Sequence, residues 1–452
     1  MSDISVADGL PGPRRYLAVA VLLMSLALIV LDGAIANIAL PSMARSLHAS
    51  AADTVWVVSS YQLAVLLALL PCGALGEIFG PRRVFLIGIV VFVIASLACA
   101  LSVSLPMLVA ARFIQGLGGG AIMALAVMNL RFAVPQRLLG TIIGINAMTI
   151  AISSAAGPGI AGAILAVATW PWLFAVNLPI GVLILLCGGF LAHTPGVARR
   201  LDAGALALNS LMFLLFFMGA DRLGKAPVSG TGLMVAAGLC LVGLLRLERN
   251  SRTPLVPIDL FADPAFRVAI VASVCCFTGQ MLSYVALPFY LQETVHMTPT
   301  QAGLYMMPWP AAVAVVAPIA GRLANRVPTA WLCAAGAALM SLGLLIVAVG
   351  PSDSRHLSLL IGTVIAGMGF GLFQTPNNRI LLLSVPKSRS GAAGAMQGTA
   401  RLTGQTFGAI VMSIIFGFAS LASASNIALI LAGGFAVLAS VVSLSRASYE
   451  RL

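Results

Sequence analysis

The sequence predicts an all-α polytopic membrane protein of fourteen spans, and three observations support this. Only 8% of the 452 residues are charged, 60% are hydrophobic, and the mean hydropathy is +1.06. A water-soluble domain carries about 25% charged residues, so this chain has too few to cover a globule in water. Its apolar runs have the length of about 20 residues that a helix needs to cross a bilayer. Barrel strands would instead show short segments of alternating polarity.

The apolar runs and the basic residues between them define the expected topology. The runs cover residues 16–40, 55–75, 84–104, 106–131, 137–163, 171–192, 203–222, 231–247, 267–291, 301–321, 331–350, 357–383, 391–419 and 425–445. Of the 25 Lys and Arg residues, 19 fall in one alternating set of loops and the termini, and four fall in the other set. Cytoplasmic loops are enriched in Lys and Arg. We therefore expect a protein of the plasma (bacterial inner) membrane with both termini in the cytoplasm.

A short internal repeat suggests how the spans are grouped. Residues 73–77 follow the second run and residues 321–325 follow the tenth, and each segment comes after a proline. Internal repeats are common in secondary transporters. The predicted organisation is a cytoplasmic N-terminus, a six-helix bundle, a linker with two extra transmembrane helices, a second six-helix bundle and a cytoplasmic C-terminus. These parts are expected at residues 1–15, 16–192, 193–266, 267–445 and 446–452.

Several other classes of function are disfavoured. The net charge of +12 is spread thinly between apolar runs, so it predicts no nucleic-acid partner. The four His never cluster, and no phosphate-binding G-x-x-x-x-G-K-[ST] motif occurs. The seven Cys lie within apolar runs, so we expect free, buried thiols. No stretch outside the runs is long enough for a catalytic domain. We therefore expect no enzyme, cofactor or metal site.

Two of the charged residues inside apolar runs are candidates for proton coupling. Asp32 belongs to the first run and Arg112 to the fourth. A charge near the bilayer centre costs about 2.5–3.5 kcal/mol on insertion scales, so such residues usually serve a function. We predict that Asp32 exchanges protons and that Arg112 tunes it, with contact between them left open. For Asp32 the alternatives are a hydrogen bond that packs helices or a position near the membrane interface. For Arg112 the alternative is an extended side chain that reaches the interface.

Two glycine-containing segments are candidates for conformational motifs. Gly157-Pro158-Gly159 interrupts the fifth run. Proline kinks a helix, and small residues allow a neighbouring helix to approach closely, so we expect this segment to move when the protein changes conformation. A static kink is the alternative. The segment 73–83 is expected to form a short loop. Its acidic residue, Glu77, would pair with an Arg or a helix N-terminus and hold the cytoplasmic face of the protein closed. The alternative is an ordinary basic cytoplasmic loop. The residues chosen for these motifs are Gly73, Glu77, Gly80, Arg82, Arg83, Gly157, Pro158 and Gly162.

Polar and aromatic residues inside the runs predict a substrate site. Singly, most are explained by hydrogen bonds between helices. As a group they describe a mixed polar and aromatic pocket, which suits large amphipathic molecules better than sugars. The candidates are Asn37, Trp56, Tyr61, Gln62, Gln115, Asn146, Gln280, Tyr284, Gln374, Asn377, Gln397 and Arg401.

Five segments together resemble the 14-span drug:proton antiporter branch of the major facilitator superfamily. They are Leu31–Pro41, Gly73–Arg83, Arg112–Gly120, Ser153–Gly162 and Trp170–Gly181. The resemblance implies a major facilitator fold, a proton-coupling role for Asp32, a part in proton transfer for Arg112 and an antiport motif in the fifth span. The sequence departs from the loop motif at Glu77, where Asp is usual, and at Ile78, where Arg is usual.

The resemblance implies a proton-coupled exporter of amphipathic drugs or toxic compounds, expected to be cationic, that works by alternating access. Its partners would be a small-molecule substrate, protons and the lipid bilayer. Two alternatives remain: an exporter of one specific metabolite, and a membrane sensor or scaffold that transports nothing. A sensor would normally add a signalling domain, for which the segments between runs are too short.

Overall fold

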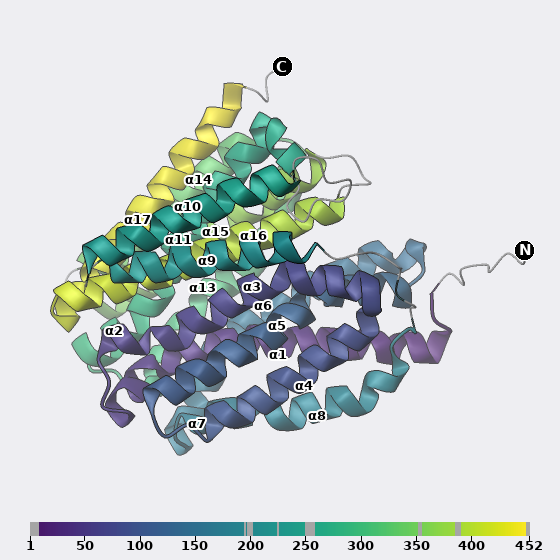
Figure 1. Ribbon diagram of the computed structural model, residues 1–452. Coiled ribbons are helices and arrows are strands. Elements are labelled where there is room, and N and C mark those ends of the chain that lie inside the picture. Colours follow the sequence, from purple (N-terminus) through teal and green to yellow (C-terminus); the bar gives the residue numbers. More distant parts are fainter. Residues whose placement is uncertain are drawn as a thin grey trace, which may run out of the picture.

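The structure is a computed structural model that describes residues 9–193, 196, 202–223, 226–248, 258–350, 355–384 and 390–448 (Figure 1). These residues form α-helices and short 3-10 or π-helical turns, with no β-strand among them. Fourteen helical segments are long and apolar enough to cross a membrane. The predicted all-α class and the predicted number of spans are therefore confirmed.

The spans follow the apolar runs, and several are built from two consecutive helices. The first eight spans comprise α1 (Gly12–Ser46), α2 (Ala51–Thr54) with α3 (Trp56–Phe79), α4 (Pro81–Ala100), α5 (Leu105–Ala133), α6 (Gln136–Val167), α7 (Pro171–Ala175) with α8 (Asn177–Cys187) and η1 (Gly188–Phe190), α9 (Ala203–Arg222) and α10 (Pro227–Glu248). After η2 (Ile258–Ala262), the remainder are α11 (Pro264–Phe289) with η3 (Tyr290–Thr294), α12 (Pro299–Met306) with α13 (Pro308–Leu323), α14 (Thr329–Val349), α15 (Arg355–Leu383), α16 (Ser390–Phe418) and α17 (Leu421–Leu444), which ends in η6 (Ser445–Ser448).

The helices pack as two groups. In the first half, α1 packs on α5, α6 and α8, while α5 packs on α3 and α4. In the second half, α11 packs on α15, α16 and α17, while α14 packs on α15 and α17. The halves meet where α16 contacts α3, α1 contacts α11, and α6 contacts α12 and α13. Figure 1 shows the purple and blue first half beside the green and yellow second half.

The helix pair α9 and α10 lies outside the first-half packing. The two helices pack on each other, and α9 also contacts α3 of the first half and α16 of the second. Phe216 of α9 stacks with Phe407 of α16 at 6.4 Å between ring centroids, and Phe217 is fully buried. The outer helix α10 exposes large apolar side chains such as Val228 and Leu239, as expected for a surface in contact with lipid. The α9 helix therefore covers the seam between α3 and α16.

Polar contacts join the halves on the side where α1 ends and α12 begins. Arg45 and Glu293 form an ion pair at 2.7 Å, and Gln292 Nε2 donates to the Ile38 carbonyl at 3.0 Å. On the same side, Thr300 Oγ1 donates to the Gly162 carbonyl at 2.9 Å. Ser413 Oγ donates to the Ala52 carbonyl at 3.0 Å. The two halves are thus closed against each other on this side, which we name the Arg45 side.

Two local features differ from the sequence-based expectation. Helix α3 continues through Pro71 to Phe79, so most of segment 73–83 is helical and the turn is Gly80 alone. Gly80 has φ +92°, a conformation that favours glycine. Arg446, expected in a cytoplasmic tail, is fully buried. Parts of the predicted linker, at 194–195, 197–201, 224–225 and 249–257, and the chain ends at 1–8 and 449–452 lie outside the described residues.

Candidate site at the buried Asp32–Arg112 pair

Asp32 lies on the buried face of α1 and is 1% exposed. The residues one turn away on the same face of α1 are also buried: Leu28, Ile29, Ile35 and Ala36. This face of the helix therefore packs against the other helices of the first half. Both carboxylate oxygens are hydrogen-bonded. Oδ2 accepts from Arg112 Nη1 at 2.5 Å, while Oδ1 accepts from Asn177 Nδ2 at 2.7 Å and from Gln115 Nε2 at 3.0 Å. The predicted pair of charged residues is therefore in direct contact.

Arg112 of α5 is also fully buried. Its Nη1 donates to Gln115 Oε1 at 2.6 Å as well as to Asp32, and its Nε donates to the Val57 carbonyl at 3.1 Å. The guanidinium carbon lies 4.1 Å from the centroid of the Tyr61 ring, which gives a cation–π contact. The positive charge of Arg112 and the negative charge of Asp32 neutralise each other, and their attraction offsets part of the desolvation cost of burying each ion.

Gln115 and Ser96 complete the hydrogen-bond network. Gln115 Nε2 donates to Ser96 Oγ at 2.7 Å, and Ser96 in turn donates to the Phe92 carbonyl at 2.7 Å. The amide of Asn177 is oriented toward the same carboxylate from α8. Four helices, α1, α4, α5 and α8, thus contribute side chains to one cluster, which we name the Asp32 network: Asp32, Ser96, Arg112, Gln115 and Asn177.

Glycines on α5 allow the neighbouring helices to approach closely enough to enclose this network. A Cβ on Gly116 would lie 2.4 Å from the Tyr61 carbonyl oxygen of α3, and one on Gly120 would lie 2.9 Å from that of Val65. On the other side, a Cβ on Gly118 would lie 2.7 Å from the Gly88 carbonyl oxygen of α4. The glycine run after Arg112 therefore serves helix packing.

Tyr61 links the Asp32 network to the second half. Its ring lies under Arg112, and its buried hydroxyl has no hydrogen-bond partner among the described residues. Arg401 of α16 lies within electrostatic reach of Tyr61. The next residue of α3, Gln62, donates from Nε2 to the Met281 sulfur of α11 at 3.4 Å. Gln62 therefore faces α11, while Tyr61 packs on Arg112 and Gly119 of α5 within electrostatic reach of α16.

Two other predicted substrate-site residues lie on α11 of the second half. Gln280 and Tyr284 lie one turn apart, and Tyr284 packs edge-on against Trp309 at 5.3 Å between centroids. The Gln280 Oε1 and Trp309 Nε1 atoms are buried and have no hydrogen-bond partner in the described part of the chain. Buried polar atoms in folded proteins are normally paired, so these two atoms are exceptions to the usual pairing.

The glycines of the fifth span lie at the contact of α6 with α12. A Cβ on Gly162 would lie 2.9 Å from Thr300 Cα, and a Cβ on Gly303 would lie 2.3 Å from the Pro158 carbonyl oxygen. A Cβ on Gly157 would lie 2.5 Å from that of Ala34 on α1. The segment therefore packs closely against both its own half and the other half.

The remaining predicted residues are dispersed. Asn37 donates to the Gly33 carbonyl of its own helix at 2.9 Å. Asn377 is buried at the far end of α15, where its Nδ2 donates to Ser273 Oγ at 2.7 Å and its Oδ1 accepts from Arg446 Nη1 at 3.1 Å. Four other predicted substrate-site residues are half-buried: Trp56, Asn146, Gln374 and Gln397. Among the predicted motif residues, Glu77 and Arg83 are exposed and Arg82 is half-buried. No atom would contact a Cβ on Gly73.

Three further residues were not among the predicted site residues. Asn177 and Ser96 belong to the Asp32 network, and Gln405 is half-buried one turn after Arg401 on α16. Asn177 and Gln405 could have been selected from the sequence, because each is an amide side chain inside an apolar run. Ser96 has no such signal, because a serine in a span commonly bonds only to its own helix.

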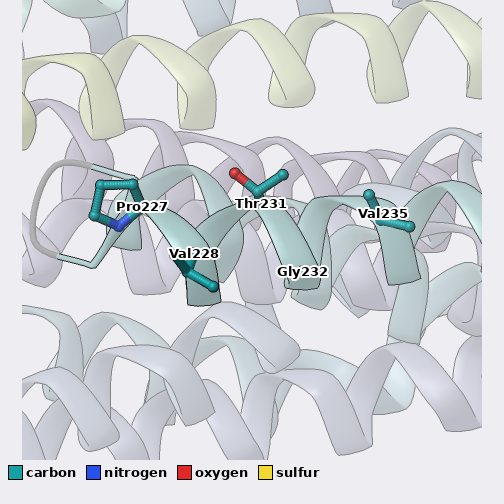
Figure 2. Close-up of a pocket in the computed structure, with 5 residues that line it drawn as sticks. All are labelled: Pro227, Val228, Thr231, Gly232 and Val235. Atoms are coloured by element: carbon teal, nitrogen blue, oxygen red, sulfur yellow. The ribbon is translucent and has the colours of Figure 1, made fainter.

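A surface depression on α10 is not part of this site. It is lined by Pro227, Val228, Thr231, Gly232 and Val235, all on one helix (Figure 2). The lining offers a single side-chain hydroxyl and no charge, whereas specific binding sites usually combine convergent polar groups from several elements. In the described residues, no group of three His, Cys, Asp or Glu side chains is placed to hold a metal ion.

Comparison with known proteins identifies a family. The family model described as Major Facilitator Superfamily matches residues 22–409, with a further match over residues 268–450. The uncharacterized transporter YebQ of Escherichia coli is 41% identical over 455 residues, which cover 98% of each chain. The multidrug resistance protein Stp of Mycobacterium tuberculosis is 31% identical, over 87% of this chain and 74% of that protein.

Two more comparisons extend this result. The riboflavin transporter RibZ of Clostridioides difficile is 28% identical, over 89% of this chain and 88% of its own length. The crystal structure of a D-xylose-proton symporter superposes with a TM-score of 0.68 at 15% identity, covering 95% of this chain and 97% of that one. This structural likeness shows a shared fold, and the named substrates belong to those relatives.

Proposed function

The chain belongs to the Major Facilitator Superfamily, and on this premise we propose that it is a proton-coupled secondary transporter that exports amphipathic compounds by alternating access. The observation that carries the proposal is the buried carboxylate of Asp32, which is held by Arg112 beside an aromatic residue at the junction of the halves. An ionisable pair inside a membrane protein is by default a candidate for proton or ion transport.

The contacts around Asp32 suggest how protonation would act on the rest of the molecule. Asp32 accepts three hydrogen bonds as a carboxylate, and protonation would weaken its bond to Arg112. The guanidinium would then shift relative to the Tyr61 ring that it now covers. Because Tyr61 also lies within electrostatic reach of Arg401 on α16, a change at Asp32 would reach the junction of the halves through two residues, Arg112 and Tyr61.

Alternating access requires contacts that can open, and the Arg45 side supplies them. The Arg45–Glu293 ion pair is partly exposed, with side-chain exposures of 55% and 28%. An exposed pair of this kind contributes roughly 0–1 kcal/mol, so it can separate at little cost. We propose that the described arrangement is closed on the Arg45 side, which the distribution of Lys and Arg places outside the cell.

The driving force is sufficient for export. One proton that crosses about 100 mV releases about 2.3 kcal/mol, and one pH unit adds about 1.36 kcal/mol. Together they would support a gradient of roughly 500-fold for a neutral substrate at one proton per cycle. The relative named as a multidrug resistance protein supports drug export, and the relative named as a riboflavin transporter supports a specific metabolite as the second candidate.

The first test replaces the proton-carrying group. We expect Asp32→Asn to abolish proton-driven efflux of whichever amphipathic dye the wild-type protein exports, with ethidium as the cationic probe and fluorescein as the anionic one, because an amide cannot bind and release the proton. Asp202→Asn is the matched control, since it makes the same change at the N-cap of α9, where Asn is an equally good cap. Proton-driven efflux by the Asp32→Asn protein at the wild-type rate would refute the coupling role. Failure of wild type to move either dye, with a specific metabolite moved instead, would favour the second candidate.

A further inference from the structure

Arg401 lies near the middle of α16 and faces the junction between α3 and α11. A Cβ on Gly398 would lie 3.2 Å from Leu69 of α3, and a Cβ on Gly404 would lie 2.5 Å from the Val274 carbonyl oxygen of α11. Successive residues of a helix are about 100° apart. Arg401, three residues from each glycine, therefore points between these two contact directions, toward the partner helices and Tyr61.

The charge of Arg401 has no counter-charge among the residues that the structure describes. No hydrogen bond or ion pair engages its side chain in the part of the chain that the structure describes, where the ion pairs are Arg112–Asp32 and Arg45–Glu293. Asp32 is the acidic residue placed mid-span, and Arg112 already neutralises it. The junction of the halves therefore carries a net positive charge.

We propose that Arg401 binds an acidic group of the substrate, so that the preferred substrates are amphipathic compounds with a carboxylate, sulfonate or phosphate. The inference rests on the proposed transport function and names its substrate class. A guanidinium inside a membrane protein needs a partner, and its planar fork matches these groups well. The expected cationic substrate would instead be repelled by Arg401.

The surroundings of Arg401 add uncharged polar groups for such a molecule. The Tyr61 hydroxyl is a buried donor without a partner among the described residues, and it lies within electrostatic reach of Arg401. Gln405 lies one turn away on the same face of α16 as Arg401. An acidic head on Arg401 would therefore have further hydrogen-bonding groups beside it.

The sign of the substrate charge has an electrical consequence. Exchange of one proton for one monovalent cation moves no net charge, whereas exchange of one proton for one monovalent anion moves two charges. An inside-negative potential would therefore accelerate export of the anion, and it would leave exchange of the cation unaffected.

The test uses two xanthene dyes of similar size and opposite charge, fluorescein and pyronin Y. Purified protein is reconstituted in vesicles, and transport of each dye is measured with a pH gradient, with and without a membrane potential. Fluorescence anisotropy of the protein in nanodiscs measures binding separately. The variants are Arg401→Gln, Arg401→Lys and, as the matched control, Arg267→Gln at an exposed position of α11.

We expect wild type and Arg267→Gln to prefer fluorescein, Arg401→Gln to lose about tenfold or more in fluorescein affinity, and Arg401→Lys to retain part of it. Pyronin Y is expected to bind Arg401→Gln at least as well as wild type. Preference of wild type for pyronin Y, no fluorescein binding, or equal fluorescein affinity of wild type and Arg401→Gln would overturn the proposal. If the proposal for Arg401 were overturned in this way, proton-driven transport of either dye would still support the proposed transport function.

Discussion

The Asp32 network and the junction of the two halves differ in how many hydrogen bonds hold their polar side chains. In the network, both oxygens of Asp32 and both polar atoms of the Gln115 amide are hydrogen-bonded, and all five side chains are buried. Arg112 Nη2 has no partner within the described residues, but Nη1 and Nε of the same guanidinium are bonded. At the junction, the Tyr61 hydroxyl and Gln280 Oε1 have no partner within the described residues. Several hydrogen bonds hold a side chain in place, whereas a side chain with an unbonded polar atom at an interface can change its contacts. The comparison separates a charge-holding centre from a surface that can open.

The largest expected effect comes from breaking the network. Arg112→Met would leave the Asp32 carboxylate buried without its counter-charge, which costs about 3–5 kcal/mol of folding stability. Arg446→Met is the matched control, because the Arg446 guanidinium is equally buried but bonds to an amide, Asn377, rather than to a carboxylate. We expect a clear fall in the thermal unfolding midpoint in detergent for the first variant and a much smaller one for the second. Equal midpoints would show that the ion pair is not the stabilising feature.

An intermediate effect is expected at the contact of α6 with α12. Gly303→Ala would place a Cβ 2.3 Å from the Pro158 carbonyl oxygen, so the halves must separate on the Arg45 side. Overpacking of this kind costs about 1–3 kcal/mol. We expect faster labelling of a cysteine introduced at Thr300, where the halves meet, than in the otherwise wild-type background.

Gly434→Ala is the control for that experiment, since no atom lies within 4 Å of a Cβ at this position of α17. Its labelling rate should match that of the background protein. If Gly303→Ala also matched it, the packing of α6 on α12 would not hold the Arg45 side closed.

The smallest expected effect is at the Arg45–Glu293 ion pair. Glu293→Gln removes one partner of a partly exposed pair, which is worth about 0.2–1 kcal/mol and is screened by salt. We expect a slight increase in opening on the Arg45 side, measured by the same labelling at low salt, and a smaller difference at high salt. A large loss of folding stability would contradict the distinction between junction and network.

The sequence was sufficient for the features that depend on local pattern. The apolar runs predicted all fourteen spans, because the length of a helix across a bilayer and the lack of backbone partners in lipid leave few choices. The charged residues Asp32 and Arg112 also stood out without a structure, since charges in apolar runs are rare. The predicted loop at 73–83 was less accurate, because glycine did not stop α3 before Gly80.

Contacts between distant residues could not be predicted. Asp32 and Asn177 are 145 residues apart in the chain, and Ser96 looks like any serine in a span. The burial of Arg446 against Asn377 was equally hidden, because a basic residue at the end of the last span normally faces the cytoplasm. Their positions depend on which helix faces pack together.

For this protein, the sequence by itself determined the all-α class, the number of spans and the charged residues that need a partner within the membrane. The tertiary structure alone decided that Asp32 pairs with Arg112, that Arg401 faces the junction of the halves with no counter-charge among the described residues, and that the halves meet on the Arg45 side. The physical reason is that a span is fixed by the local free energy of transfer into lipid. The pairing of charges depends on helix packing that brings together residues far apart in the chain.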